Sequence, residues 1–159
     1  MGMLLLNAND REETATRYLA EGLNAACAPW LGGAARDAIE AKLDRSGWDV
    51  SDAAFGSSGG WGDISVSLVG DSYRSRGCEV RVRTNEQPWS TIALTTAAQA
   101  WIAQTFPGGE RVRSLSSIVS GQAARVAVWQ DAGAKITMTV FLAKQAAPLA
   151  DLILAVERS

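Results

Sequence analysis

The stretch "RGCEVRVRTN", residues 76–85, has the strict alternation of apolar and polar side chains that is typical of a half-buried β-strand. Its apolar face carries Cys78, Val80 and Val82. Its other face carries three charged residues: Glu79, Arg81 and Arg83. Because successive side chains of a strand point to opposite faces, this segment predicts a sheet with one face on a core and the other in solvent.

Helical patterns precede this strand. Residues 7–31 place apolar side chains at the three- and four-residue spacing of one helical face, with Cys27 on that face. Pro29 is predicted to end this helix, since the residue before a proline disfavours helical backbone angles. Residues 32–47 predict a second, shorter helix with Gly47 just past its end.

The pattern changes from helical to strand-like after the second helix. Residues 49–62 are rich in Gly and Ser, show no periodicity and predict a connecting loop. Alternation with a period of two then begins in residues 61–70 and returns in residues 78–84, so these segments predict an antiparallel hairpin. A third helix is predicted over about residues 96–106, ended by Pro107.

The remaining segments predict further strands. Residues 111–119 predict a weak strand, residues 123–144 predict a hairpin with its turn at "DAG", and residues 151–159 predict an edge strand. The chain is therefore expected to be an α+β domain, with an antiparallel sheet of about five strands and its helices on one face. The single domain, 1–159, divides into a helical segment 1–48, a loop 49–62, and a sheet 63–159 that contains the inserted helix.

The chain contains two cysteines, Cys27 and Cys78, and both are predicted to face the layer between helix and sheet. Two buried free thiols are one interpretation, because Cys packs as a small hydrophobic residue. A disulfide is the favoured interpretation, since closing a loop of this length would stabilise the fold by about 4 kcal/mol. Such a bridge would indicate an oxidising compartment, of which the bacterial periplasm is the expected one.

The composition argues against several kinds of chemistry. The chain has no His, and two cysteines without CxxC spacing leave a zinc site short of ligands. The stretch "GSSGG", residues 56–60, matches G-x-S-x-G, but no strand is predicted before it and no base is available. We therefore predict a protein that is not an enzyme and that needs no metal or cofactor. A hydrolase with paired carboxylates is the alternative left open, since such pairs meet only in space.

The charge distribution bears on the kind of partner. The net charge of −2 and the acidic pI of about 5.2 argue against nucleic acid. Residues 1–70 carry a net −5 and residues 71–125 a net +3, an asymmetry that indicates an interaction face. No apolar run approaches the roughly 18 residues of a membrane-spanning helix.

Arginines form the first candidate binding site. Arg74 and Arg76 fall in the predicted hairpin loop, and Arg81 and Arg83 fall on the polar face of the following strand. Guanidinium groups hold carboxylates through paired hydrogen bonds, so these residues are expected to bind an anion or an acidic partner. The alternative is an ordinary solvated face on which Glu79 supplies the local counter-charge.

Aromatic residues form the second candidate site. In the predicted hairpin, Trp129 lies on the strand face opposite Val126 and Val128, and the same parity places Phe141 beside it. Without a helix over that face, the two rings would form an exposed apolar patch of the kind that marks an interface.

These observations predict an exported, non-enzymatic binding or inhibitor-like module that engages a protein or a small anionic ligand through its sheet face. The alternative is a cytoplasmic protein-interaction factor, such as a secretion chaperone or a toxin-immunity protein. Both interpretations are compatible with a homodimer. A fold class alone does not decide between them, because one fold hosts many functions.

Overall fold

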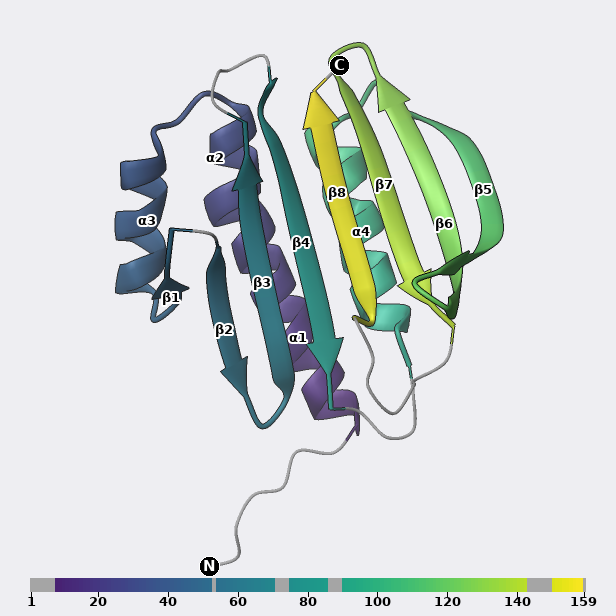
Figure 1. Cartoon of the computed structure of the whole chain (residues 1–159), viewed down its shortest axis with the longest axis horizontal. Helices are drawn as coiled ribbons and strands as arrows, with labels where there is room; N and C mark the ends of the chain where they lie inside the picture. Colours follow the sequence, from purple (N-terminus) through teal and green to yellow (C-terminus); the bar gives the residue numbers. More distant parts are fainter. Residues whose placement is uncertain (1–7, 53, 71–74, 86–89, 143–149, 159) are drawn as a thin grey trace, which may run out of the picture.

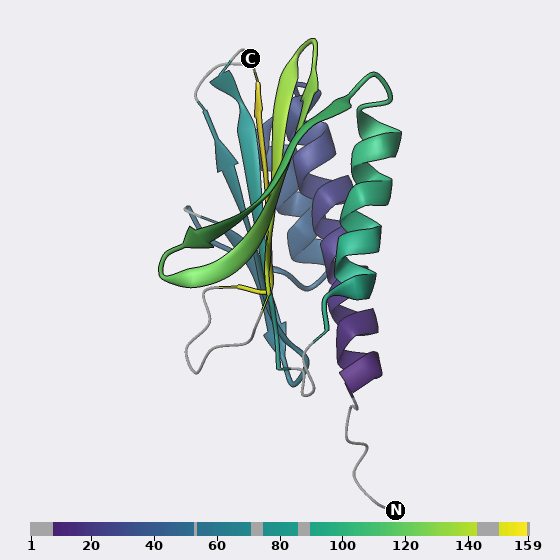
Figure 2. The same cartoon turned by 90° about the vertical axis from the view of Figure 1, so that its right-hand side faces the viewer.

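The structure is a computed structural model that describes residues 8–52, 54–70, 75–85, 90–142 and 150–158. It consists of one continuous antiparallel sheet with a layer of helices over one side (Figure 1, Figure 2). We call the side under the helices the inner face and the opposite side the outer face. The predicted α+β class and the antiparallel sheet are therefore confirmed.

The described part of the chain contributes eight strands to this sheet, in the order β1-β2-β3-β4-β8-β7-β6-β5. In chain order they are β1 Asp49–Val50, β2 Phe55–Gly59, β3 Gly62–Val69, β4 Gly77–Thr84, β5 Glu110–Val119, β6 Gln122–Asp131, β7 Ala134–Phe141 and β8 Leu152–Arg158. The order consists of two four-stranded meanders, each of which follows helical segments. The meanders join through their last strands, because β4 pairs antiparallel with β8 at the centre.

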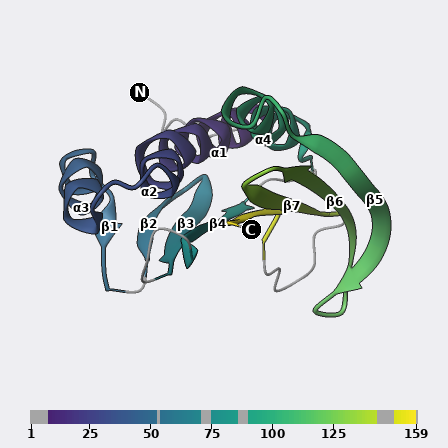
Figure 3. The same ribbon diagram turned by 90° about the horizontal axis from the view of Figure 1, so that it is seen from above.

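Helices lead into each meander. α1 (Ala8–Gly22) continues into a π-helical turn, η1 (Leu23–Cys27), and then into α2 (Ala28–Leu31). α3 (Arg36–Arg45) leads into the first meander, and α4 (Ile92–Thr105) leads into the second. α1 and α4 contact each other and lie side by side over the inner face (Figure 3).

Pro29 does not end the first helix, contrary to the expectation from sequence. The π turn restarts the hydrogen-bond pattern, with the N–H of Ala28 donating to the carbonyl of Leu23. Pro29 then occupies a first-turn position of α2, where a missing N–H requires no partner. A single π turn has no periodic signal, so the sequence pattern could not anticipate it.

The prediction of about five strands is wrong, and so is the loop over residues 49–62, which forms β1 and β2. Gly and Ser are weak strand formers, but packing overrides this preference here. Phe55 is fully buried, and β2 pairs with β3 along its whole length. Gly62 has a φ of +137°, and a Cβ at this position would lie 2.0 Å from the carbonyl oxygen of Arg83. Gly62 therefore lies where β3 approaches β4 closely, rather than in an open loop.

The start of α4 depends on a residue far away in the chain. Glu12 of α1 is 6% exposed, and its Oε1 accepts a hydrogen bond from the backbone N–H of Ala93 at 2.6 Å. This N–H lies in the first helical turn, which offers no carbonyl partner within the helix. The cap comes from another helix, so the local sequence pattern placed the predicted start too late, at about residue 96 rather than at Ile92.

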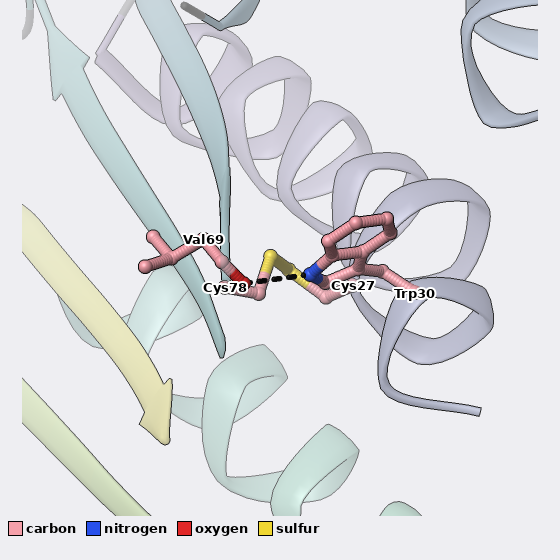
Figure 4. Close-up of a disulfide and its surroundings, with 4 residues drawn as sticks. All are labelled: Cys27, Trp30, Val69 and Cys78. Carbon is pink, nitrogen blue, oxygen red and sulfur yellow. Dashed lines mark hydrogen bonds between the residues drawn. A yellow bond between two sulfur atoms is a disulfide. The ribbon is translucent and has the colours of Figure 1, made fainter. Parts of the chain in front are cut away.

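A disulfide joins Cys27, at the end of η1, to Cys78 in β4, with 5.5 Å between the two Cα atoms (Figure 4). Both cysteines are almost completely buried. Beside them, the indole N–H of Trp30 donates a hydrogen bond to the carbonyl of Val69 at 3.1 Å. The predicted bridge is confirmed, and it attaches the helical layer to one of the two central strands of the sheet.

Candidate functional site

Carboxylates neutralise the arginines that project from the outer face of β4. The Nε of Arg81 donates to Glu79 at 2.5 Å. Two nitrogens of Arg83 donate to one carboxylate oxygen of Asp63, at 2.9 and 2.5 Å. Exposed pairs of this kind contribute little stability. They do provide local counter-charges, so neither guanidinium faces a ligand uncompensated.

Arg76 has a structural role in the described fold. Its Nη1 donates to the carbonyls of Trp30 at 2.8 Å and Ala34 at 2.7 Å, and its guanidinium lies 3.7 Å from the centroid of the Trp30 ring. Arg76 therefore ties the connection between α2 and α3 to the loop before β4. Arg74 lies outside the described residues. The structure does not bring the three described arginines of the predicted group together into one anion site.

Trp129 and Phe141 lie on opposite faces of the sheet, so the predicted shared patch is wrong. Trp129 pairs with Ile136, whose side chain is buried on the inner face, whereas Phe141 pairs with Ala124. Phe141 is 1% exposed, in a small outer-face cluster with Ala124 and Ala150. The two rings therefore cannot form one surface.

The cause is the register of the β6–β7 hairpin. Asp131 pairs with Ala134, so the turn holds two residues, one fewer than the predicted "DAG" turn. A change of one residue in the register reverses the face of every side chain on one strand relative to the other. This register turns Val126 and Val128 to the outer face and Trp129 to the inner face.

The helix layer leaves part of the inner face uncovered. β5 and β6 extend beyond α4 and bend away from it (Figure 3), with a register shift between Arg111 and Arg113 that increases the curvature. Four inner-face residues of β5 are exposed: Arg111, Ser114, Ser116 and Ile118. A groove therefore runs between α4 and the β5–β6 hairpin, and we call it the α4 groove.

The α4 groove consists of two adjoining cavities with volumes of about 330 and 380 Å³, and both are lined by Gln99 and Arg111. The cavity at the C-terminal end of α4 is also lined by Ile102, Ala103, Phe106, Pro107, Gly109 and Trp129. The cavity at the N-terminal end is also lined by Thr91, Thr95, Arg125, Ala127, Met138, Val140 and Leu142. The groove therefore follows α4 along its whole length.

The α4 groove carries basic side chains and has an apolar floor. Arg111 and Arg125 are exposed, and neither makes an ion pair within the part of the chain that the structure describes. The guanidinium of Arg111 lies 5.4 Å from the ring centroid of Trp129. Apolar side chains such as Met138 and Leu142 form the floor. None of the described lining residues is acidic.

Sequence reasoning missed Arg111, Arg125 and Gln99 as candidate binding residues. Both arginines belong to the basic segment 71–125, which was the one sequence signal that pointed toward them. Placing them on one surface required the full length of β5 and its register with β6. The pattern gave residues 111–119 only as a weak strand.

This arrangement is suited to holding a ligand. The described residues contain no group of three or more Cys, Asp or Glu side chains that could hold a metal ion. The groove itself offers two permanent positive charges, two threonine hydroxyls, one glutamine amide and an apolar floor. Such a surface recognises molecules that combine carboxylates with apolar groups.

Within the described ranges, none of the helices combines the length and the apolar character required to cross a membrane. Comparison of the chain with protein-family models, with curated proteins and with solved structures found no match.

Proposed function

We propose that this chain is a non-enzymatic, exported binding module that holds an acidic segment of a partner protein in the α4 groove. One observation carries the proposal: Arg111 and Arg125 stand beside an apolar floor, and no carboxylate is found among the described residues that line the groove. By contrast, Arg81 and Arg83 on the outer face already have carboxylate partners.

The size of the groove favours a protein segment over a small anion. α4 has 14 residues, which corresponds to about 21 Å at a rise of about 1.5 Å per residue. Lining residues extend from Thr91 to Pro107, so the groove has a similar length. A small carboxylate would contact one arginine and leave most of the apolar floor in water. An acidic segment with apolar side chains would engage both arginines and cover the floor.

The disulfide supports the exported part of this proposal, because such bridges persist in oxidising compartments and are rare in the cytosol. We expect the two cysteines to be oxidised in the native host. The measurement is thiol alkylation in cells lysed directly into acid, with and without later reduction. Labelling of Cys27 and Cys78 before any reductant is added would argue for the cytoplasmic interaction protein instead.

We predict that replacing Arg111 and Arg125 together by Ser weakens the binding of an acidic partner by about tenfold at low ionic strength. Exposed ion pairs contribute up to about 1 kcal/mol each, and a loss of about 1.4 kcal/mol corresponds to a factor of ten. The probe is a fluorescently labelled peptide rich in Glu and Leu, and its dissociation constant is measured by anisotropy. High salt should reduce the difference between the two proteins.

Two controls make this measurement specific. The double variant Arg81→Ser with Arg83→Ser removes the same charge from the outer face, so it should change the affinity less than twofold. A second peptide carries Lys at every Glu position and should not bind. Equal loss in both double variants would mean that net charge alone attracts the probe, and the proposed function would then be abandoned.

A further inference from the structure

We infer that the segment bound in the α4 groove is an amphipathic α-helix, which lies beside α4 and extends the helical layer over β6 and β5. This inference rests on the proposed function and specifies the conformation of the partner. The motivation is the incomplete helical layer: β6 and β5 extend beyond α4, and no described helix covers them there (Figure 3).

Hydrogen bonding at the groove floor favours a helix over an extended segment. The backbone of β6 is already paired with β5 on one side and with β7 on the other. An extended peptide lying on this floor would find no backbone partners, and unpaired buried N–H and C=O groups are costly. A helix satisfies its backbone internally. In the described sheet, the long unpaired strand edge is the outer edge of β5, and that edge is not the floor.

The groove-facing side of α4 has the form that a neighbouring helix requires. The N-cap residue and three helical residues line the groove at intervals of four: Thr91, then Thr95, Gln99 and Ala103. Such a row forms a ridge that fits between the ridges of a second helix. Three of its four side chains are short, which permits close approach, and the fourth is an uncharged amide.

The arginine positions define the expected charge pattern of the partner helix. Arg111 lies opposite Trp129 in the β5–β6 register, and Trp129 is four residues from Arg125 on the same strand. Four strand residues span roughly 13 Å. At a helical rise of about 1.5 Å, seven or eight residues span about 11–12 Å. Acidic residues at this separation stay on one helical face and come within about 3 Å of the arginine spacing. The face of the helix toward Met138 and Leu142 should be apolar.

The test is a selection from displayed random peptides of about 16 residues, long enough to follow α4, on the oxidised full-length chain. We expect enriched peptides with apolar residues every three or four positions and with acidic residues seven or eight apart. Their circular dichroism should become helical on binding. Gln99→Glu should weaken the binding of these peptides about threefold at low salt, because the new negative charge on α4 faces the acidic partner. The matched control is Gln104→Glu, an exposed α4 residue that does not line the groove.

The outcomes separate this inference from the proposed function. The selection could instead enrich acidic peptides with alternating apolar residues, whose binding is weakened by the double arginine variant but not by Gln99→Glu. That pattern would indicate strand addition at the edge of β5. That result would contradict the proposed helical conformation and would support the proposed acidic partner. If no acidic peptide is enriched, or if the arginine variant binds equally well, both proposals fail. If Gln99→Glu and Gln104→Glu change the affinity equally, the inference of a helix bound in the groove is also contradicted.

Discussion

Reduction of the Cys27–Cys78 disulfide is expected to lower the free energy of unfolding by about 4 kcal/mol, since the bridge closes a loop across a sequence separation of 51 residues. The bond restricts the unfolded chain, and in the folded state it connects the helical layer to β4. The expected loss is a large fraction of the stability of an ordinary domain. Urea unfolding of the oxidised and reduced protein, followed by tryptophan fluorescence, measures it directly.

Comparison of oxidised and reduced protein of identical sequence keeps the packing of both side chains nearly constant. The double variant Cys27→Ala with Cys78→Ala is a second measurement, and it should lose somewhat more stability because the buried sulfur atoms are also removed. Intact mass after alkylation confirms the oxidation state of each sample. A difference below about 1 kcal/mol between the oxidised and reduced protein would contradict the loop-closure mechanism.

The disulfide was predictable because each cysteine carried its own periodic context. Cys27 fell on the apolar face of a helical pattern, and Cys78 fell on the apolar face of an alternating strand. Packing the helix on the sheet then placed both thiols in one layer. The same reasoning gave the helix-on-sheet architecture and the strands whose alternation is regular, since burial of one face imposes a period on the sequence.

The predicted number of strands was wrong because packing, rather than the sequence pattern, decides the structure of residues 49–62. β2 has the sequence "FGSSG", in which Phe55 is the one large apolar side chain, and its pairing with β3 replaces an intrinsic preference for loops. The predicted start of α4 was wrong for a related reason, because Glu12 of α1 supplies the cap. Contacts between residues far apart in the chain produce no recognisable pattern in the sequence around either residue.

The candidate site was the least predictable part, because a surface made by several strands depends on every register between them. A turn shorter by one residue moved Trp129 to the inner face, away from Phe141. The charges of Arg81 and Arg83 were visible in the sequence, but the partner of Arg83, Asp63, lies on the neighbouring strand. Arg111 and Arg125 became neighbours of one groove only through the pairing of β5 with β6.

The seam between the two meanders contains a buried acidic residue, Asp151, which precedes β8. Its Oδ2 accepts hydrogen bonds from the backbone N–H of Thr84 at 2.8 Å and from the hydroxyl of Thr84. Its own N–H donates to the carbonyl of Val82 at 2.7 Å, and its carbonyl accepts from the N–H of Phe141 at 3.1 Å. Asp151 and Thr84 both have 0% exposure. The residue thereby links β4 of the first meander to β7 of the second.

We expect Asp151→Ala to lower the free energy of unfolding by about 3 kcal/mol. The substitution leaves two buried donors of Thr84 without their acceptor, and each such loss costs about 1–3 kcal/mol. Asp151→Asn keeps one acceptor oxygen in a side chain of the same shape, so it should lose less than the alanine variant. Urea unfolding measures both variants, and hydrogen exchange at the amide of Thr84 should accelerate in the alanine variant.

A double-mutant cycle assigns the effect to this contact rather than to the loss of a charge. Thr84→Val removes the hydroxyl and keeps the backbone N–H, so its cost should be smaller after Asp151→Ala than in the original protein. Asp52→Ala, at an exposed position, should change stability by less than about 0.5 kcal/mol. If the two substitutions at the seam are additive, Asp151 stabilises the fold through its other contacts. The hydrogen bonds to Thr84 would then not be what holds the two meanders together.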